Sequence, residues 1–347
     1  MIEVRGLNKN FGAKRAVDNL SFTVREGAAY GLLGRNGAGK TTTIRILMNV
    51  FREDSGEALF NGVPAFKESV RIGYLPEERG LYPKRTVLEQ LVYFGQLKGL
   101  NKKTIEAEVK AKLEEMEATE YLNAKLQTLS KGNQQKIQLA ASMLGDPEVI
   151  ILDEPFSGLD PINAQVLKNA VRRQAREGRT VIFSSHQMAQ VEEFCDDICI
   201  IDHGHAVLEG NLSAIKRGYP RDLIYIETEG IPGQQGTEDS GAYNILRKQP
   251  YVLDVSHKGN GFLVRLDDPA KRNLLLRTLE EEDARVDSFY VVEPTLEQIF
   301  VEKVGAADPA DEEEKPEQPP GKGGKKSNAF VNLTTRKFKK LGGMFTK

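Results

Sequence analysis

The sequence predicts an α/β fold with a largely parallel sheet over residues 1–212, followed by a smaller α+β unit. Two observations lead to the first of these predictions. Short apolar runs alternate with amphipathic stretches, as they do when strands and helices take turns along a chain. In addition, a glycine-rich phosphate-binding pattern at 34–41 follows an apolar run and precedes a helix-like stretch, which is the context that this pattern requires.

Apolar runs of buried-strand length indicate the strands of the first domain. They cover residues 27–33, 148–153, 180–185 and 197–202. Between about 84 and 145, apolar residues instead recur at i, i+3 and i+4, the spacing of amphipathic helices. We therefore expect a helical subdomain at 84–145 within the α/β domain.

A second unit is predicted at 213–303. Its patterns indicate a strand, a helix, two strands, a helix, a strand and a closing helix. These elements are expected at 222–228, 242–248, 251–257, 261–266, 269–282, 285–292 and 295–304, with a long polar loop at 230–241. The β-α-β-β-α-β order is that of a small ferredoxin-like α+β domain.

Composition excludes several classes of protein. A length of 347 residues suggests about two domains, and a net charge of -2 argues against a nucleic-acid partner. No apolar run approaches the roughly 20 residues that span a bilayer, and the N-terminus lacks the apolar segment of a signal peptide. Cys195 and Cys199, without a second Cys/His pair, are predicted to be core thiols rather than metal ligands. Few cysteines fit a reducing, cytoplasmic compartment.

The end of the chain, 304–347, is acidic, then rich in proline and glycine, then basic. Such a composition buries no core, so we expect a disordered tail. The last residues interleave basic and aromatic side chains, among them Phe330, Phe338 and Phe345. An alternative interpretation is therefore a short peptide that contacts an anionic membrane face or a partner.

The motif "GRNGAGKTT" carries the chemistry of phosphate binding. Its glycines let backbone N–H groups approach phosphate oxygens, and the following helix presents its positive end. Lys40 is expected to reach the β- and γ-phosphates, and the Thr41 hydroxyl to ligate Mg²⁺. The expected nucleotide-binding residues are Gly34, Arg35, Asn36, Gly37, Ala38, Gly39, Lys40, Thr41 and Thr42. The motif predicts a P-loop NTPase.

Two further polar elements follow strands of the predicted sheet. Asp153 and Glu154 come directly after one apolar strand, and His186 ends the next one in "FSSH". In a phosphate-loop ATPase the first carboxylate takes a magnesium-bound water and the second polarises the attacking water. Because ligands bind at the carboxyl ends of parallel strands, we expect both elements and the phosphate loop to meet in one crevice. The structural alternatives are an ordinary strand-to-loop transition for the two carboxylates, and a surface or hydrogen-bonded core residue for the histidine.

The stretch "LSKGNQQK" at 129–136 raises a different question. Ser130 precedes a helical pattern and is predicted to be its N-cap. Gly132 in the first turn bares backbone N–H groups, which makes a second anion site. One phosphate-binding lysine has little use for two anion sites unless they face each other across a dimer.

The motifs "GRNGAGKTT", "LSKGNQQK", "VIILDEPFSGLD" and "FSSH", in this order, resemble the nucleotide-binding subunit of ABC transporters over about 1–212. The resemblance implies ATP and Mg²⁺ as ligands, Phe11 stacked on adenine, and His186 in contact with the γ-phosphate. Residues 157–160 would form the D-loop, which ends at Asp160. It further implies a head-to-tail homodimer that sandwiches each ATP between the phosphate loop of one chain and the "LSKGN" stretch of the other.

This sequence departs from the family pattern at two places. The signature LSGGQ is here "LSKGN", which keeps Ser130 and Gly132 and substitutes Lys131 and Asn133. The glutamine of the Q-loop is replaced by Glu77, whose carboxylate remains a possible oxygen ligand for Mg²⁺.

The segments "LPEERGLYP" and "TLEQIFVEKVG" look most like ATPases of sodium or drug exporters. This implies an ATPase at the cytoplasmic face of the cell membrane that drives a separate membrane permease, with the helical subdomain docked on it. The main alternative is a soluble ABC-type ATPase acting on ribosomes or DNA; a phosphate-loop kinase is a third class. Ribosome-acting relatives usually carry two nucleotide domains, and DNA-acting ones carry very long coiled coils, unlike this sequence.

Overall fold

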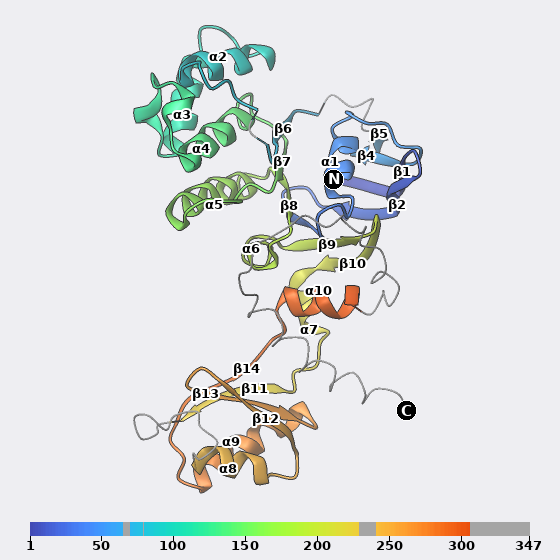
Figure 1. The fold of residues 1–347 in the computed structure, drawn as a ribbon, viewed down its shortest axis with the longest axis vertical. Helices are drawn as coiled ribbons and strands as arrows, with labels where there is room; N and C mark the ends of the chain where they lie inside the picture. The colour runs from blue at the N-terminus through green and yellow to red at the C-terminus, as the bar shows by residue number, and fades with distance from the viewer. Residues whose placement is uncertain (65–69, 79, 229–240, 306–347) are drawn as a thin grey trace, which may run out of the picture. The chain divides into compact units, whose positions relative to one another are not determined.

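The computed structural model describes residues 1–64, 70–78, 80–228 and 241–305 (Figure 1). The expectations for the tail from residue 306 onward, including its aromatic residues, and for nearly all of the polar loop 230–241 fall outside these ranges. Among the helices within them, none has the length and apolar character needed to cross a membrane.

A six-stranded sheet forms the centre of the first domain (Figure 1). Its order is β10-β9-β3-β8-β7-β6, with all neighbours parallel except β10, which pairs with β9 antiparallel. The strands are β3 (Ala29–Leu33), β6 (Ile72–Leu75), β7 (Val149–Asp153), β8 (Thr180–Ser185), β9 (Asp197–Asp202) and β10 (His205–Asn211). The four predicted strands are β3, β7, β8 and β9, so the parallel sheet is confirmed.

A second sheet in the same domain is antiparallel, with the order β2-β1-β4-β5. Its strands are β1 (Ile2–Phe11), β2 (Lys14–Val24), β4 (Ser55–Phe60) and β5 (Val63–Pro64). The sequence pattern did not predict this sheet. The pairing of β1 with β2 shifts register three times, and each bulge breaks the alternation of apolar and polar residues by which a half-buried strand is recognised.

The strands of the central sheet bury both faces. In β3, Ala29 and Leu33 belong to one apolar core, and Tyr30 and Leu32 to another. Successive side chains of a strand point to opposite faces, so each core covers one side of the sheet. One core includes α1 (Lys40–Leu47) and the antiparallel sheet; the other includes α4 (Lys131–Ser142), α5 (Pro161–Arg176), α6 (Met188–Phe194) and α7 (Leu212–Arg217).

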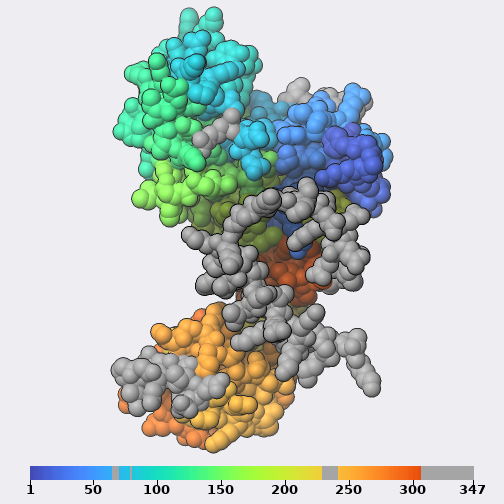
Figure 2. Space-filling view, in the orientation of Figure 1, coloured from blue at the N-terminus to red at the C-terminus, as the bar shows by residue number. Residues whose placement is uncertain are grey.

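The stretch at 84–145, for which we expected a helical subdomain, is mainly helical. It contains α2 (Val87–Leu97), α3 (Ile105–Glu115) and α4, with short 3₁₀ turns at Thr119–Tyr121 and Leu126–Thr128. Thr86 and Glu89 close a capping box that begins α2. In the space-filling view these helices, cyan to green, pack against one another and on α5 (Figure 2).

The second unit has its own core and the predicted order of elements. Its antiparallel sheet runs β12-β13-β11-β14, the strand order of a ferredoxin-like fold. The elements are β11 (Leu223–Thr228), α8 (Gly241–Lys248), β12 (Val252–Lys258), β13 (Gly261–Leu266), the 3₁₀ turn Pro269–Lys271, α9 (Arg272–Glu281) and β14 (Val286–Val291).

The closing helix α10 (Leu296–Gly305) behaves differently from the rest of this unit. The sequence pattern counts it with the accessory domain, whereas Leu296, Phe300 and Val304 are buried in a core of the first domain. The helix packs on α6 and β10. The apolar side chains of α10 therefore pack against the first domain and not against the ferredoxin-like sheet.

Candidate functional site

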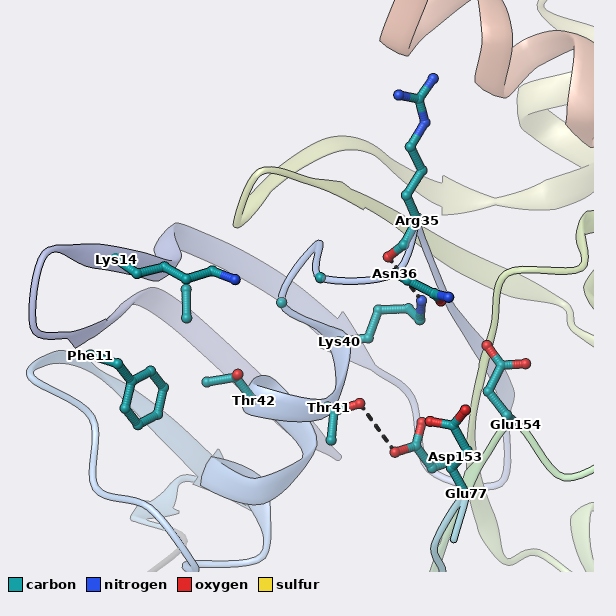
Figure 3. Close-up of a pocket in the computed structure, with 13 residues that line it drawn as sticks. Phe11, Lys14, Arg35, Asn36, Lys40, Thr41, Thr42, Glu77, Asp153 and Glu154 are labelled. Carbon is teal, nitrogen blue, oxygen red and sulfur yellow. Dashed lines mark hydrogen bonds between the residues drawn. The ribbon is translucent and has the colours of Figure 1, made fainter. Parts of the chain in front are cut away.

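A cavity of about 330 Å³ is lined from the carboxyl edge of the central sheet, the phosphate-loop motif and the β1–β2 hairpin (Figure 3). It brings together most of the residues predicted for nucleotide binding. The lining consists of Phe11, Lys14, Ala16, Arg35, Asn36, Gly37, Gly39, Lys40, Thr41, Thr42, Glu77, Asp153 and Glu154. Residues from four distant parts of the sequence therefore share one pocket.

The glycines of the loop at 34–39 are required by the backbone. Gly34, Gly37 and Gly39 have φ angles of 155°, 83° and 111°, which L-residues with a side chain rarely adopt. A Cβ on Gly39 would lie 2.5 Å from the carbonyl oxygen of Ala16, and one on Gly34 would clash with the carbonyl of Ile201. The motif thus specifies the shape of the loop as well as its chemistry.

Lys40 is the first residue of α1, and its side chain folds back over the loop. Its Nζ donates hydrogen bonds to the carbonyl oxygens of Gly34 (2.7 Å) and Arg35 (3.2 Å). Burial lowers the pKa of the Lys40 ammonium, and nearby carboxylates oppose that shift. These carboxylates are Glu154, Asp153 and Glu77. The result is a cation at the centre of the pocket with acidic groups on one side.

Oxygen ligands of the kind that Mg²⁺ prefers lie beside this lysine. The Thr41 hydroxyl donates to Asp153 Oδ2 at 3.2 Å (Figure 3). Ser184 Oγ donates to the other oxygen of Asp153. Glu77 lines the same cavity. The described residues contain no group of three His, Cys, Asp or Glu side chains that could hold a metal alone. The donor set fits a cation that also uses oxygens of a bound phosphate.

Glu154, which lines the pocket, is held in a fixed orientation. Its Oε1 accepts a hydrogen bond from the backbone N–H of His186 at 2.8 Å and lies 2.7 Å from His186 Nδ1. Its Oε2 accepts from Ser185 Oγ at 3.2 Å. The backbone of Glu154 has a φ of 49°, an unfavourable conformation for a residue with a side chain. Three hydrogen bonds therefore fix the carboxylate of Glu154, and its backbone adopts an unfavourable conformation.

Five of the predicted nucleotide-binding residues do not line this cavity: Gly34 and Ala38 of the loop, and Ser130, Gly132 and Asp160. Ser130 caps α4 as predicted, accepting from Asn133 N at 3.2 Å. Asp160 caps α5, accepting from the backbone N–H of Asn163 at 2.9 Å. Gly132 is buried against the same Asn163, whose amide nitrogen would be 2.5 Å from a Cβ on the glycine. Within one chain, these residues make helix-cap and packing contacts.

Phe11 and Ala38 occupy different surroundings. Phe11 ends β1, is 44% exposed at the cavity, and meets Phe51 edge-on at 5.3 Å. Ala38 is buried in the core beneath the loop. The sequence interpretation missed Lys14 and Ala16, which follow Phe11 in the unpredicted hairpin, and the two serines that orient the carboxylates. Those serines, Ser184 and Ser185, precede His186 in "FSSH", so their position at the end of a strand was the available signal.

Comparisons with known proteins identify the family of this chain. Residues 17–157 match the ABC transporter family, and residues 210–304 match the C-terminal domain of DrrA1-3-like ATP-binding proteins. An ABC transporter ATP-binding protein of Alkalihalophilus pseudofirmus is 43% identical over 277 residues, which covers 80% of this chain and 99% of the relative. A solved "ATP binding subunit of ABC transporter" superposes with a TM-score of 0.58 at 29% identity, covering 63% of this chain and 92% of its own.

Two further relatives carry more specific names. Nod factor export ATP-binding protein I of Ralstonia nicotianae is 32% identical and covers 88% of this chain and 94% of the relative. The linearmycin resistance ATP-binding protein LnrL of Bacillus subtilis is 30% identical and covers 88% and 98%. This chain belongs to the ABC transporter ATP-binding proteins. It is an ATPase subunit with a DrrA-like C-terminal domain, and nothing in the comparisons supports action on ribosomes or DNA.

Proposed function

We propose that this ATPase drives export through a separate membrane subunit and works as a homodimer with two shared ATP sites. The names of the relatives support export, since two of them refer to Nod factor export and linearmycin resistance. For the same reason we place drug-like molecules ahead of sodium ions as the exported class. The observation that carries the dimer is the separation of the cavity from Ser130, Gly132 and Asp160.

The cavity binds ATP in this proposal. Phe11 presents an exposed ring face for the adenine, and the loop from Gly34 to Gly39 surrounds the phosphates with backbone N–H groups. Lys40 has three donors, of which two already meet loop carbonyls. Thr42, in the first turn of α1, adds a hydroxyl at the positive end of that helix.

We assign hydrolysis to Glu154 and His186, whose side chains contact each other. Glu154 polarises the attacking water, and His186 contacts the γ-phosphate while it orients Glu154. The imidazole can donate to both the carboxylate and the phosphate only when both ring nitrogens carry protons. Thr41, Asp153 and Glu77 would hold Mg²⁺, which neutralises charge on the phosphates when bound.

The second chain completes each site. Ser130 Oγ accepts a hydrogen bond from the backbone N–H of Asn133, the third residue of α4. The backbone N–H groups of the first two residues of that helix therefore have no partner within the helix. In our proposal, these two N–H groups bind a phosphate that a second molecule supplies. A two-fold dimer would bring the partner's ATP there, with Gly132 and Asp160 in the same contact surface.

Mixing two inactive variants tests the shared sites. Lys40→Ala removes the phosphate-binding cation, and Ser130→Arg places a bulky charge at the start of α4. If the sites are shared, a mixed dimer contains one site with both lesions and one intact site, so ATPase activity should return. If each site is built within one chain, every site in the mixture carries a lesion, and demonstrated mixed dimers without activity contradict the proposal.

An aromatic hollow on α2 is the proposed contact with the membrane subunit. It has a volume of about 380 Å³ and is lined by Tyr82, Arg85, Glu89, Gln90 and Tyr93. Tyr82 and Tyr93 are about half exposed and meet at 6.3 Å, and Tyr82 also stacks on Phe94. Exposed aromatic groups around a hollow are typical of a surface that receives a protein partner.

This contact would hold the ATPase at the cytoplasmic face of the cell membrane. Tyr93→Ser should reduce co-sedimentation of the full-length chain with native membranes and leave the ATPase activity of the isolated chain intact. Tyr290→Ser, at a half-exposed tyrosine of the other unit, is the matched control. Deleting 318–347 in parallel measures whether the basic tail adds to recruitment. Equal sedimentation of the Tyr93 and Tyr290 variants would remove the hollow from the proposal.

A further inference from the structure

The closing helix α10 is attached to the first domain at two points that lead to the ATP site. The first attachment is apolar: Phe300 is 7% exposed and belongs to the core that also contains Val191 and Phe194 of α6. The second is polar: the backbone N–H of Leu296 donates to Glu192 Oε2 at 3.1 Å. Glu192 also pairs with Lys216 through its other oxygen, which orients the carboxylate.

One face of Phe300 meets the phosphate loop itself. The guanidinium carbon of Arg35 lies 6.0 Å from the centre of the Phe300 ring, within the range of a cation–π contact. In the close-up, the Arg35 side chain extends away from Lys40 and Thr41 toward a red-tinted helix, which is α10 (Figure 3). The loop residue whose backbone lines the cavity thus has its side chain held outside it.

This contact bears on the position of Lys40. The carbonyl oxygen of Arg35 accepts a hydrogen bond from Lys40 Nζ at 3.2 Å, so the backbone of Arg35 is one of the groups that orient the ammonium. Arg35 lies between Gly34 and Gly37, and glycines restrict a backbone less than any other residue. A loop of this composition gains more from a side-chain anchor than an ordinary turn does.

The attachment through Glu192 reaches the other half of the site. Glu192 lies on α6, which begins two residues after His186, and His186 orients Glu154. On the other side, only four residues separate α10 from β14 of the ferredoxin-like sheet. A displacement of that strand would therefore act on α10, and through it on the phosphate loop and on α6.

We propose that α10 is a positioning element of the ATP site, with Phe300 as the residue that holds the phosphate loop through Arg35. The accessory domain is thereby linked to nucleotide binding within a single chain. The inference rests on the role assigned above to loop 34–42 in binding ATP.

Steady-state ATPase kinetics of the full-length chain test this role. Phe300→Leu keeps an apolar side chain in the core and removes the ring face, whereas Phe300→Tyr keeps the face. We expect Phe300→Leu to raise KM for ATP about threefold to tenfold, the range of a cation–π contact, with kcat changed less than twofold. Phe300→Tyr should be close to wild type. Val301→Ala, at a 62% exposed position of the same helix, is the matched control.

The arginine supplies the second half of the test. Arg35→Ala should raise KM by a similar factor, and adding Phe300→Leu to it should cause no further rise, because both changes remove one contact. Thermal midpoints of all variants identify any general loss of folding. Phe300→Leu kinetics equal to those of Val301→Ala, or effects of Arg35→Ala and Phe300→Leu that multiply, would overturn the inference.

Lys40→Ala, measured in the same series, separates this inference from the proposed function. Loss of ATP binding in Lys40→Ala is the result that the proposed function requires. Normal binding in that variant would contradict the role of the phosphate loop, whereas a silent Phe300→Leu beside a defective Lys40→Ala contradicts only the role of α10.

Discussion

The phosphate loop and the stretch at 129–136 both place a glycine at the start of a helix, but their surroundings differ. In the loop, three glycines have positive φ angles, a lysine is buried, and carboxylates converge from two other strands. At 129–136, Ser130 caps the helix, and Gly132 packs on Asn163. The first region holds its functional groups together within one chain, whereas the second is a capped helix start, which we propose faces a second chain.

The difference shows how the two regions would contribute to the proposed shared site. Glu154 adopts an unfavourable backbone conformation that the surrounding structure must stabilise, and the loop uses conformations that are readily open only to its glycines. The half at 129–136 contributes N–H groups that any capped helix start possesses. The predictions below change one side or the other, in order of expected effect.

The largest effect is expected on the side of the loop. Glu154→Gln should leave ATP binding intact and slow hydrolysis by roughly 10²–10⁴, the usual contribution of a positioned general base. Because hydrolysis would no longer reopen the dimer, ATP should accumulate a closed dimer that size-exclusion chromatography detects. Glu114→Gln, at an exposed position of α3, is the control. An active Glu154→Gln enzyme would show that another group serves as the base.

The second prediction concerns the packing of the other region. Gly132→Ala should lower the free energy of unfolding by about 1–3 kcal/mol, as overpacking does, because the new Cβ meets the amide of Asn163. Asn163→Ala removes the two nearest atoms of that side chain and should restore much of the stability in the double variant. Chemical denaturation measures both changes.

The activity of that double variant sharpens the comparison. If the double variant folds normally and remains inactive with ATP, the surface of Gly132 is needed by the second chain. If its activity recovers together with its stability, the glycine serves only the packing of α4 on α5.

A third prediction tests the exposed ring at the edge of the cavity. Phe11→Ala should weaken binding of ATP and of GTP alike by about 1–3 kcal/mol, taking base–aromatic stacking in nucleic-acid binders as a guide. Phe11→Trp, which keeps a ring face, should bind both nucleotides nearly normally. Fluorescence titration with labelled nucleotides gives the affinities, and an unchanged affinity in Phe11→Ala would limit Phe11 to its contact with Phe51.

The smallest effect is expected at the cap of α5. Hydrogen bonds from the Asn163 backbone and side chain hold the pKa of the Asp160 carboxyl below its usual value. A carboxyl with a depressed pKa in the folded state adds stability above its unfolded pKa, and this is lost as pH falls through the folded pKa. The thermal midpoint of Asp160→Ala should therefore lie below wild type at neutral pH, and the gap should narrow on acidification. The gap for Asp160→Asn should be smaller at neutral pH, because an asparagine also caps a helix, and it should narrow on acidification in the same way, because the pH dependence comes from the wild-type carboxyl.

Sequence patterns predicted much of the fold and of the site. The parallel strands were recognisable because both of their faces are buried, which makes them continuous apolar runs. The bulged strands of the antiparallel sheet were not recognisable from the sequence, because register shifts interrupt the alternation of apolar and polar residues. In the site, Lys40, Asp153 and Glu154 were found from motifs, whereas Lys14 and Ala16 were missed together with the hairpin that carries them.

The sequence by itself determined the local chemistry of this protein. Glycine spacing sets the shape of the phosphate loop, Ser130 and Asp160 cap the helices that follow them, and the carboxylates stand at the end of a buried strand. Each of these depends on residues within a few positions of one another. Only the tertiary structure decided which apolar surface receives α10, and that Phe300 meets Arg35. An amphipathic helix must bury its apolar stripe, but its own sequence does not state against which partner, because that contact depends on α6, β10 and the phosphate loop, which lie far away in the sequence.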